Sequence, residues 1–239
     1  MRIVDYSTGL RALAPEFLVT PDMLDAVSLS GDRGGMVLGS GPNGEPLSVA
    51  VLRPLPTRFV LVGGLYLARQ VTLRAMATGA WVVVATGRPD AWRVVLHAAG
   101  EGANDEPAPL VQIRQLAPRE LPRASEDAPL VVVHDATAVP QELFPPRLPW
   151  QTTLYVLPYL HPQANATANN ADLVLMQRLP ADQAQLAGRM WRLSPPLVNQ
   201  LMGLKDDQVI ALGANLWQPL RLVTTPKERN ILGPIRRGD

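Results

Sequence analysis

The chain contains no cysteine and only three histidines, His97, His134 and His161. The lack of cysteine excludes thiol nucleophiles, disulfides and Cys-ligated zinc or iron–sulfur sites. Three scattered histidines leave little for a histidine-rich metal centre, so we predict no bound metal. There is no run of about 18 apolar residues that could cross a membrane. The first five residues lack the apolar core of a signal peptide, so we expect the chain to be cytoplasmic, either free or held at a membrane by its partners.

An excess of charge of one sign is also missing. The chain has 22 Lys and Arg against 21 Asp and Glu, a net charge of +1. A dedicated nucleic-acid-binding protein would show a basic stripe, so we predict no nucleic-acid partner. With 239 residues, 47% of them hydrophobic, the chain allows one large or two small domains. It can build its core without disulfides or metals.

Apolar runs that alternate with helical spacing predict an α/β fold. Residues 59–62, 81–85 and 130–133 are continuous apolar runs, the last followed by His134 and Asp135, and residues 65–76 repeat with helical spacing up to Gly79. Continuously apolar strands that alternate with helices indicate a mostly parallel sheet covered on both faces. Further strands are predicted at residues 111–116, 152–157, 172–177, 209–212 and 219–223. Further helices are predicted at residues 91–99, 181–192 and 194–202, and a polar loop is predicted at residues 161–170.

The N-terminal part differs from this pattern. Residues 36–52 form two short apolar runs around a Gly/Pro/Asn loop, which predicts a β-hairpin. A short helix is expected near residues 22–28. We divide the chain into an N-terminal extension (1–35), an α/β domain (36–228) and a basic tail (229–239), which we expect to fray from Glu228 onward.

The turn at Gly63 and Gly64 has the order of a phosphate-binding loop: a buried strand, glycine, then a helix. A working loop needs the spacing G-x-x-x-x-G-K-[ST]. Counted from Gly63, that spacing puts Ala68 at the second glycine, Arg69 at the lysine and Gln70 at the hydroxyl. None of the three fits, and bulky apolar residues occupy the intervening loop. A tight strand-to-helix turn without nucleotide is the alternative interpretation, and the one we favour.

The strand at 130–135 ends in Asp135 and is similar to a Walker B strand, in which such an aspartate holds Mg²⁺. Ala136 stands where a second acid would follow. An aspartate at a strand end also often caps a helix or forms a turn. No serine lies in a G-x-S-x-G context, and we identify no catalytic constellation and predict no cofactor.

Two segments resemble elements of FtsK/HerA-type RecA-like ATPase domains. Residues 171–178, Ala-Asp-Leu-Val-Leu-Met-Gln-Arg, look like a strand near the end of such domains, and residues 223–229 look like their closing "TPxE" element. The resemblance covers residues 36–228 and implies a RecA-like fold. Residues 63–66, 79–84 and 87–89 resemble degenerate domains of actinobacterial type VII (ESX) secretion machines. The departures at Ala68, Arg69, Gln70 and Ala136 mean that we carry over only the fold.

Two hypotheses follow. In the first, the chain is a non-catalytic scaffold or regulatory subunit, a pseudo-ATPase that binds secretion-machine components or itself. Function resides in sites rather than in folds, so this role is assigned by analogy with proteins of the same fold. Its candidate anchor residues, which could equally be core residues, are Trp92, Trp150, Trp191 and Trp217.

In the second hypothesis the chain is an unconventional nucleotide-binding enzyme. Gly63 and Gly64 would then approach the phosphates, Arg69 would replace the lysine, and Asp135 would hold the metal. Arginine can pair with phosphate through two hydrogen bonds. A Rossmann-like transferase without a P-loop is a more distant alternative.

Overall fold

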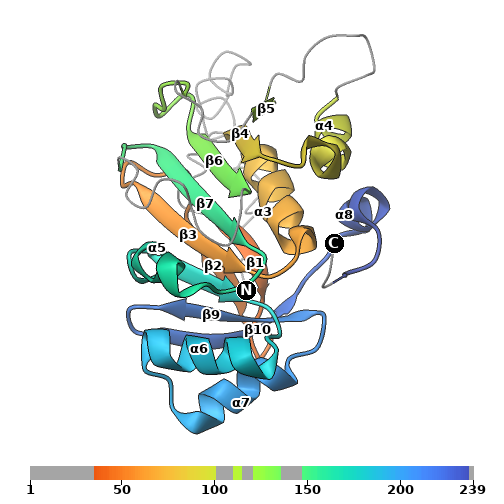
Figure 1. Ribbon diagram of the computed structural model, residues 1–239. Helices are drawn as coiled ribbons and strands as arrows, with labels where there is room; N and C mark the ends of the chain where they lie inside the picture. The colour runs from red at the N-terminus through yellow and green to blue at the C-terminus, as the bar shows by residue number, and fades with distance from the viewer. Residues whose placement is uncertain (1–34, 101–109, 115–120, 136–146, 237–239) are drawn as a thin grey trace, which may run out of the picture. The chain divides into compact units, whose positions relative to one another are not determined.

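A ten-stranded mixed sheet forms the centre of the computed structural model, which describes residues 35–100, 110–114, 121–135 and 147–236 (Figure 1). The described residues belong to one compact unit, Asp32–Asp239. The strand order is β2-β1-β10-β9-β8-β3-β7-β6-β4-β5. The helix expected at residues 22–28 lies outside the described residues.

Six of the strands run parallel to one another, from β8 to β5. They are β3 (Thr57–Val62), β4 (Trp81–Thr86), β5 (Val111–Arg114), β6 (Leu130–Asp135), β7 (Gln151–Leu157) and β8 (Leu173–Met176). Strands β3, β7 and β8 are buried along their whole length. Because both faces of the sheet are covered, these strands can carry apolar residues at successive positions, which explains the apolar runs in the sequence. The predicted mostly parallel α/β fold is confirmed.

The other four strands extend the sheet in antiparallel fashion. β1 (Met36–Ser40) and β2 (Pro46–Val49) form the predicted hairpin, and β9 (Gln208–Gly213) pairs with β10 (Leu216–Leu222). β10 begins three residues earlier than residue 219, where we predicted it. Its first residues pair with β9 close to the turn, where Leu216 lies opposite Gly213.

Helices cover both faces of the sheet with two large apolar cores, beside a small third cluster of Val83, Leu130 and Val132. α3 (Leu65–Ala77) and α4 (Arg93–Ala98) pack on one face. α5 (Asn165–Asn169), α6 (Ala181–Trp191) and α7 (Pro195–Gly203) belong to the core of the other face. Short 3-10 helices, η2 (Pro89–Trp92) and η3 (Pro162–Ala164), precede α4 and α5. In the part of the chain that the structure describes, none of the helices combines the length and apolar character needed to span a bilayer.

Two segments that we predicted as irregular are helical. The segment at 161–170, expected as a polar loop, contains η3 and α5, because Ala164, Thr167 and Ala168 turn into the core. The tail expected to fray from Glu228 is also wrong in part, because α8 (Pro226–Leu232) occupies it. Thr225 and Glu228 form a capping box at the start of α8, each side chain accepting the other residue's backbone N–H.

Candidate functional site

The turn between β3 and α3 is tight. α3 begins at Leu65, directly after Gly63 and Gly64, and residues 65–68 are already helical and buried. A phosphate loop needs these residues as loop backbone that wraps the anion before the helix starts. The turn therefore has the glycines of such a loop without its length. Arg69 lies half-buried in the second turn of α3, away from the first residues of the helix.

Gln177 occupies the position in front of the α3 N-terminus. It follows β8, and its side-chain oxygen Oε1 accepts the backbone N–H of Gly64 at 2.7 Å. Its own backbone N–H donates to the carbonyl of Val62 at 3.0 Å. The Gln177 residue is buried, and a side chain on Gly63 would lie 2.2 Å from its Oε1. An N–H that a bound phosphate would normally take at a helix N-terminus is thus satisfied from within the chain.

Residue Gln70, at the position counted as the hydroxyl of the phosphate loop, faces the C-terminal segment. Its side-chain nitrogen Nε2 donates to the carbonyl of Val223 at 3.0 Å and lies 3.4 Å from the Glu228 carboxylate. One turn earlier on α3, the Tyr66 hydroxyl lies 3.5 Å from that of Thr224. Gln70 and Tyr66 therefore both contact the segment that joins β10 to α8.

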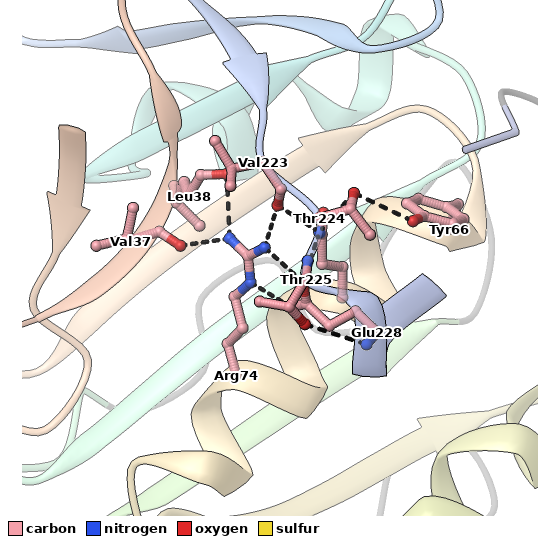
Figure 2. Close-up of polar contacts among 9 residues, drawn as sticks. Val37, Leu38, Tyr66, Arg74, Val223, Thr224, Thr225 and Glu228 are labelled. Atoms are coloured by element: carbon pink, nitrogen blue, oxygen red, sulfur yellow. Dashed lines mark hydrogen bonds and ion pairs between the residues drawn. The ribbon is translucent and has the colours of Figure 1, made fainter. Parts of the chain in front are cut away.

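Arg74, one turn beyond Gln70, completes this contact (Figure 2). Its guanidinium donates to both carboxylate oxygens of Glu228, at 2.5 and 2.9 Å. It also donates to the backbone carbonyls of Val37, Leu38 and Val223. Arg74 therefore joins α3 to β1, to the end of β10 and to α8.

The surroundings of Glu228 set the pKa of its carboxyl. Burial would raise the pKa of the Glu228 carboxyl, but the hydrogen bonds from Arg74 and from the Thr225 backbone, with the Arg74 charge, outweigh it. The pKa therefore lies below its ordinary value of 4.5. Glu228 therefore stays ionised near neutral pH and keeps its ion pair with Arg74. We call this pair, with the backbone carbonyls that Arg74 binds, the Arg74–Glu228 clamp.

Asp135 lies at the end of β6, at the same edge of the sheet as Gly63 and Gly64, with β7 between the two strands. Two strand spacings separate them by about 10 Å. The buried Asp135 carboxylate accepts hydrogen bonds from Thr86 Oγ1 at 2.9 Å and Trp92 Nε1 at 2.8 Å. Arg88 forms an ion pair with both of its oxygens, at 2.7 and 3.0 Å.

These contacts decide whether the residues fit a nucleotide with its Mg²⁺. A carboxylate offers about four acceptor positions, and at Asp135 the four donor groups of Thr86, Arg88 and Trp92 take them. A metal ion would have to displace the Arg88 guanidinium, and a phosphate would have to displace Gln177. The described residues therefore do not fit the nucleotide that the RecA-like fold implies, and the structure does not bring Arg69 and Asp135 into contact.

His134, beside Asp135 on β6, points to the opposite face of the sheet. Its ring stacks on the Tyr155 ring of β7, with centroids 5.1 Å apart and planes at 19°. Burial lowers the pKa of the His134 imidazole to about 4. His134 is therefore neutral near pH 7 and belongs to the packed sheet.

The candidate anchor tryptophans have different surroundings. Trp92 is fully buried and bonded to Asp135, so its assignment as an exposed anchor is wrong. Trp191, the last residue of α6, and Trp217 on β10 are partly buried against the core that contains α6 and α7, and the Trp217 indole N–H donates to Gln200. Trp150 is half-buried just before β7 and has a positive φ of 58°.

Sequence reasoning missed Gln177, Arg74 and the partners of Asp135. No local pattern marks a glutamine after a strand as a helix cap. The spacing Thr225-x-x-Glu228 does match a capping box and could have predicted α8. The Arg88–Asp135 pair has no signal in the sequence, because only the pairing of β4 with β6 brings the two residues together.

The fold has relatives among solved structures. No protein-family model matches the sequence, and no curated protein matches it either. The structure of VirB4 of Thermoanaerobacter pseudethanolicus aligns with a TM-score of 0.56 and 10% identity, covering 81% of this chain and 98% of VirB4. The genome packaging NTPase B204 of Sulfolobus turreted icosahedral virus 2, in complex with AMPPCP, aligns with a TM-score of 0.51 and 10% identity. That alignment covers 72% of this chain and 99% of B204. The chain therefore shares the RecA-like ATPase fold, and at this identity the likeness extends to the fold alone.

Proposed function

We propose that this chain is a non-catalytic RecA-like domain, a pseudo-ATPase that acts through protein–protein contacts as a scaffold or regulatory subunit of a secretion machine. One observation carries the proposal: the positions at which a RecA-like domain would hold phosphate and metal are bonded to the chain's own side chains. Gln177 caps Gly64 and Arg88 neutralises Asp135. A domain that keeps this fold without the nucleotide retains its sheet and its surfaces for binding other proteins.

The type of machine is proposed from the sequence. The segments at 63–66, 79–84 and 87–89 resemble degenerate domains of type VII (ESX) secretion systems. Those segments include the glycine turn, the first four residues of β4 and Arg88, which is the ion-pair partner of Asp135. The partners proposed for the chain are therefore secretion-machine components, or further copies of itself.

Calorimetric titration of ATP with Mg²⁺, then of ADP, tests the proposal. We expect no heat of binding and no rise in the melting temperature up to millimolar nucleotide, since a ligand that binds the folded state must stabilise it. An active RecA-like ATPase measured in the same buffer is the positive control. Micromolar binding would refute the pseudo-ATPase.

A second function, an unconventional nucleotide-binding enzyme, is favoured by one observation: Gly63, Gly64 and Asp135 lie at the same edge of the parallel sheet. In such sheets ligands bind outside the carboxyl ends of the strands. This alternative requires that Arg69→Ala and Asp135→Asn each abolish nucleotide binding in a folded chain, whereas Lys205→Ala, at an exposed residue of the α7–β9 loop, leaves it unchanged.

A further inference from the structure

A surface groove of about 610 Å³ lies beside the clamp, between the second half of α3, the end of α4 and α8. It lies at the C-terminal end of α3, whereas the Gly63–Gly64 turn precedes the N-terminal end of that helix. Six apolar residues form much of its wall: Leu73, Met76, Ala77, Ala99, Leu110 and Ile231. The volume is within the range of about 300–1,000 Å³ that is usual for binding sites.

Exposed apolar side chains extend this wall to the surface. Val37 is 40% exposed and Val223 is 46% exposed, and both line the groove. Arg74 holds them at this position, because its guanidinium donates to the backbone carbonyls of both residues. A contiguous apolar surface of this kind marks an interaction site more often than scattered exposed residues do.

The charges that line the groove are unequal. Arg74 and Glu228 neutralise each other at one side of the groove. Lys227, on α8, then remains as an exposed cation of the lining, and no carboxylate among the described residues forms an ion pair with it. The groove is therefore apolar inside and carries one uncompensated positive charge, Lys227, on its α8 side.

We propose that this groove binds a short apolar peptide segment of a partner protein, flanked by Asp or Glu residues. Apolar side chains of the peptide fill the space between α3 and α8, and a carboxylate of the peptide faces Lys227. Such grooves commonly take one apolar face of a peptide, with charges at the rim that select the partner. The inference rests on the proposed function in one respect, namely that the ligand is a protein.

A selection from a phage library of random twelve-residue peptides, against the full chain, tests this inference. We expect the enriched peptides to combine apolar residues with adjacent Asp or Glu. Fluorescence anisotropy of the tightest labelled peptide then measures its affinity for variants. Ala77→Phe fills the groove from an exposed position of α3 and should abolish binding, while Ala181→Phe, at an exposed position of α6, should not.

The charge is tested with the two lysines of the chain. Lys227→Glu should weaken the selected peptide about tenfold, since it turns an attraction into a repulsion. Lys205→Glu makes the same change on an exposed loop outside the groove and should leave the affinity unchanged. Circular dichroism melting confirms that each variant is folded.

Three outcomes would overturn the inference: no enriched peptide, peptides that bind Ala77→Phe as tightly as the native chain, or peptides without carboxylates that are insensitive to Lys227→Glu. Nucleotide binding is a separate readout. A chain that binds ATP and also binds these peptides in the groove would refute the pseudo-ATPase and keep the groove assignment. A chain that binds neither keeps the pseudo-ATPase and loses the groove.

Discussion

The Arg88 guanidinium forms a two-point ion pair with the buried Asp135 carboxylate, through Nη2 to Oδ1 at 2.7 Å and Nε to Oδ2 at 3.0 Å. The two residues lie at the ends of neighbouring parallel strands, β4 and β6. Trp92 Nε1 donates to the same carboxylate from η2. Asp135 thereby ties η2 and the residues after β4 to the centre of the sheet, which is a structural role for the residue that the Walker B resemblance suggested as a metal ligand.

Asp135→Ala should therefore destabilise the fold. It leaves the buried donors of Trp92 and Thr86 without an acceptor, which costs about 1–3 kcal/mol for each. Arg88→Ala leaves the buried Asp135 carboxylate without its counter-charge but with the hydrogen bonds from Thr86 and Trp92, and should cost about 3 kcal/mol. Urea unfolding measures both.

The matched control is Asp90→Ala, which removes an ion pair with Arg93 in which both side chains are about 80% exposed. It should change the stability by less than about 0.5 kcal/mol. If Asp135→Ala proves no more destabilising than Asp90→Ala, the structural role of Asp135 is wrong, and its position in the fold would favour a metal ligand instead.

Gly63 and Gln177 provide a second test. Gly63→Ala adds a methyl group 2.2 Å from Gln177 Oε1 at a residue with φ of +152°, so it combines backbone strain with a steric clash. Gly79→Ala places the same methyl group at φ of +94° in open space, and so measures strain alone. Strain costs about 1–3 kcal/mol, and we expect Gly63→Ala to cost about 1–3 kcal/mol more than Gly79→Ala in urea unfolding.

The double variant Gly63→Ala with Gln177→Ala isolates the clash. Removing the carboxamide should restore part of the stability that Gly63→Ala loses, so the two substitutions should be non-additive. Strictly additive effects would show that Gln177 does not occupy the space in front of α3. None of these variants is expected to gain ATP binding, because α3 still begins at Leu65.

The prediction of the fold succeeded where the physical signal is local. β3, β4 and β6 are buried over at least five of their six residues, so each appears in the sequence as a continuous apolar run. The hairpin of β1 and β2 is marked by its Gly/Pro/Asn loop. Gly79 marks the end of α3, with φ of +94°.

The candidate site could not be predicted in the same way. Counting residues from Gly63 assumed a loop, but whether residues 65–68 are loop or helix depends on their burial in the core, which a motif does not encode. Gln177 and Gly64 are 113 residues apart, and Arg74 and Glu228 are 154 apart. Side-chain contacts over such separations arise only from the strand order, and the sequence pattern predicts strands more reliably than their neighbours.

The Arg74–Glu228 clamp should respond to pH. The pKa of Glu228 is lowered in the folded state, so its contribution to stability is fully present above the ordinary value of 4.5 and is lost as the pH falls through the lower, folded-state pKa. Glu228→Gln should destabilise the chain by about 2 kcal/mol at pH 7. The difference from the native chain should shrink in urea unfolding below pH 4.5.

The control for the clamp is Asp206→Asn, which removes an exposed ion pair with Arg178 at 3.7 Å. Its effect should be below about 0.5 kcal/mol throughout. A difference between the native chain and Glu228→Gln that stays constant from pH 7 to pH 3 would contradict the clamp as described.

His134 gives a pH effect of the same sign at higher pH. Its pKa is about 4 in the folded chain and 6.5 as an ordinary value, because burial disfavours the charged imidazolium. Between these two values the unfolded chain binds more protons than the folded one, so stability rises with pH there. The native chain should lose up to about 3 kcal/mol as the pH falls from 6.5 to 4. His134→Phe, which keeps a ring against Tyr155 and cannot be protonated, should remove most of this loss. His97→Phe, at an exposed position of α4, should leave it in place. Urea unfolding at half-unit pH steps measures all three chains, and a slope that is equal in the native chain and in His134→Phe would show that His134 is not the group that titrates.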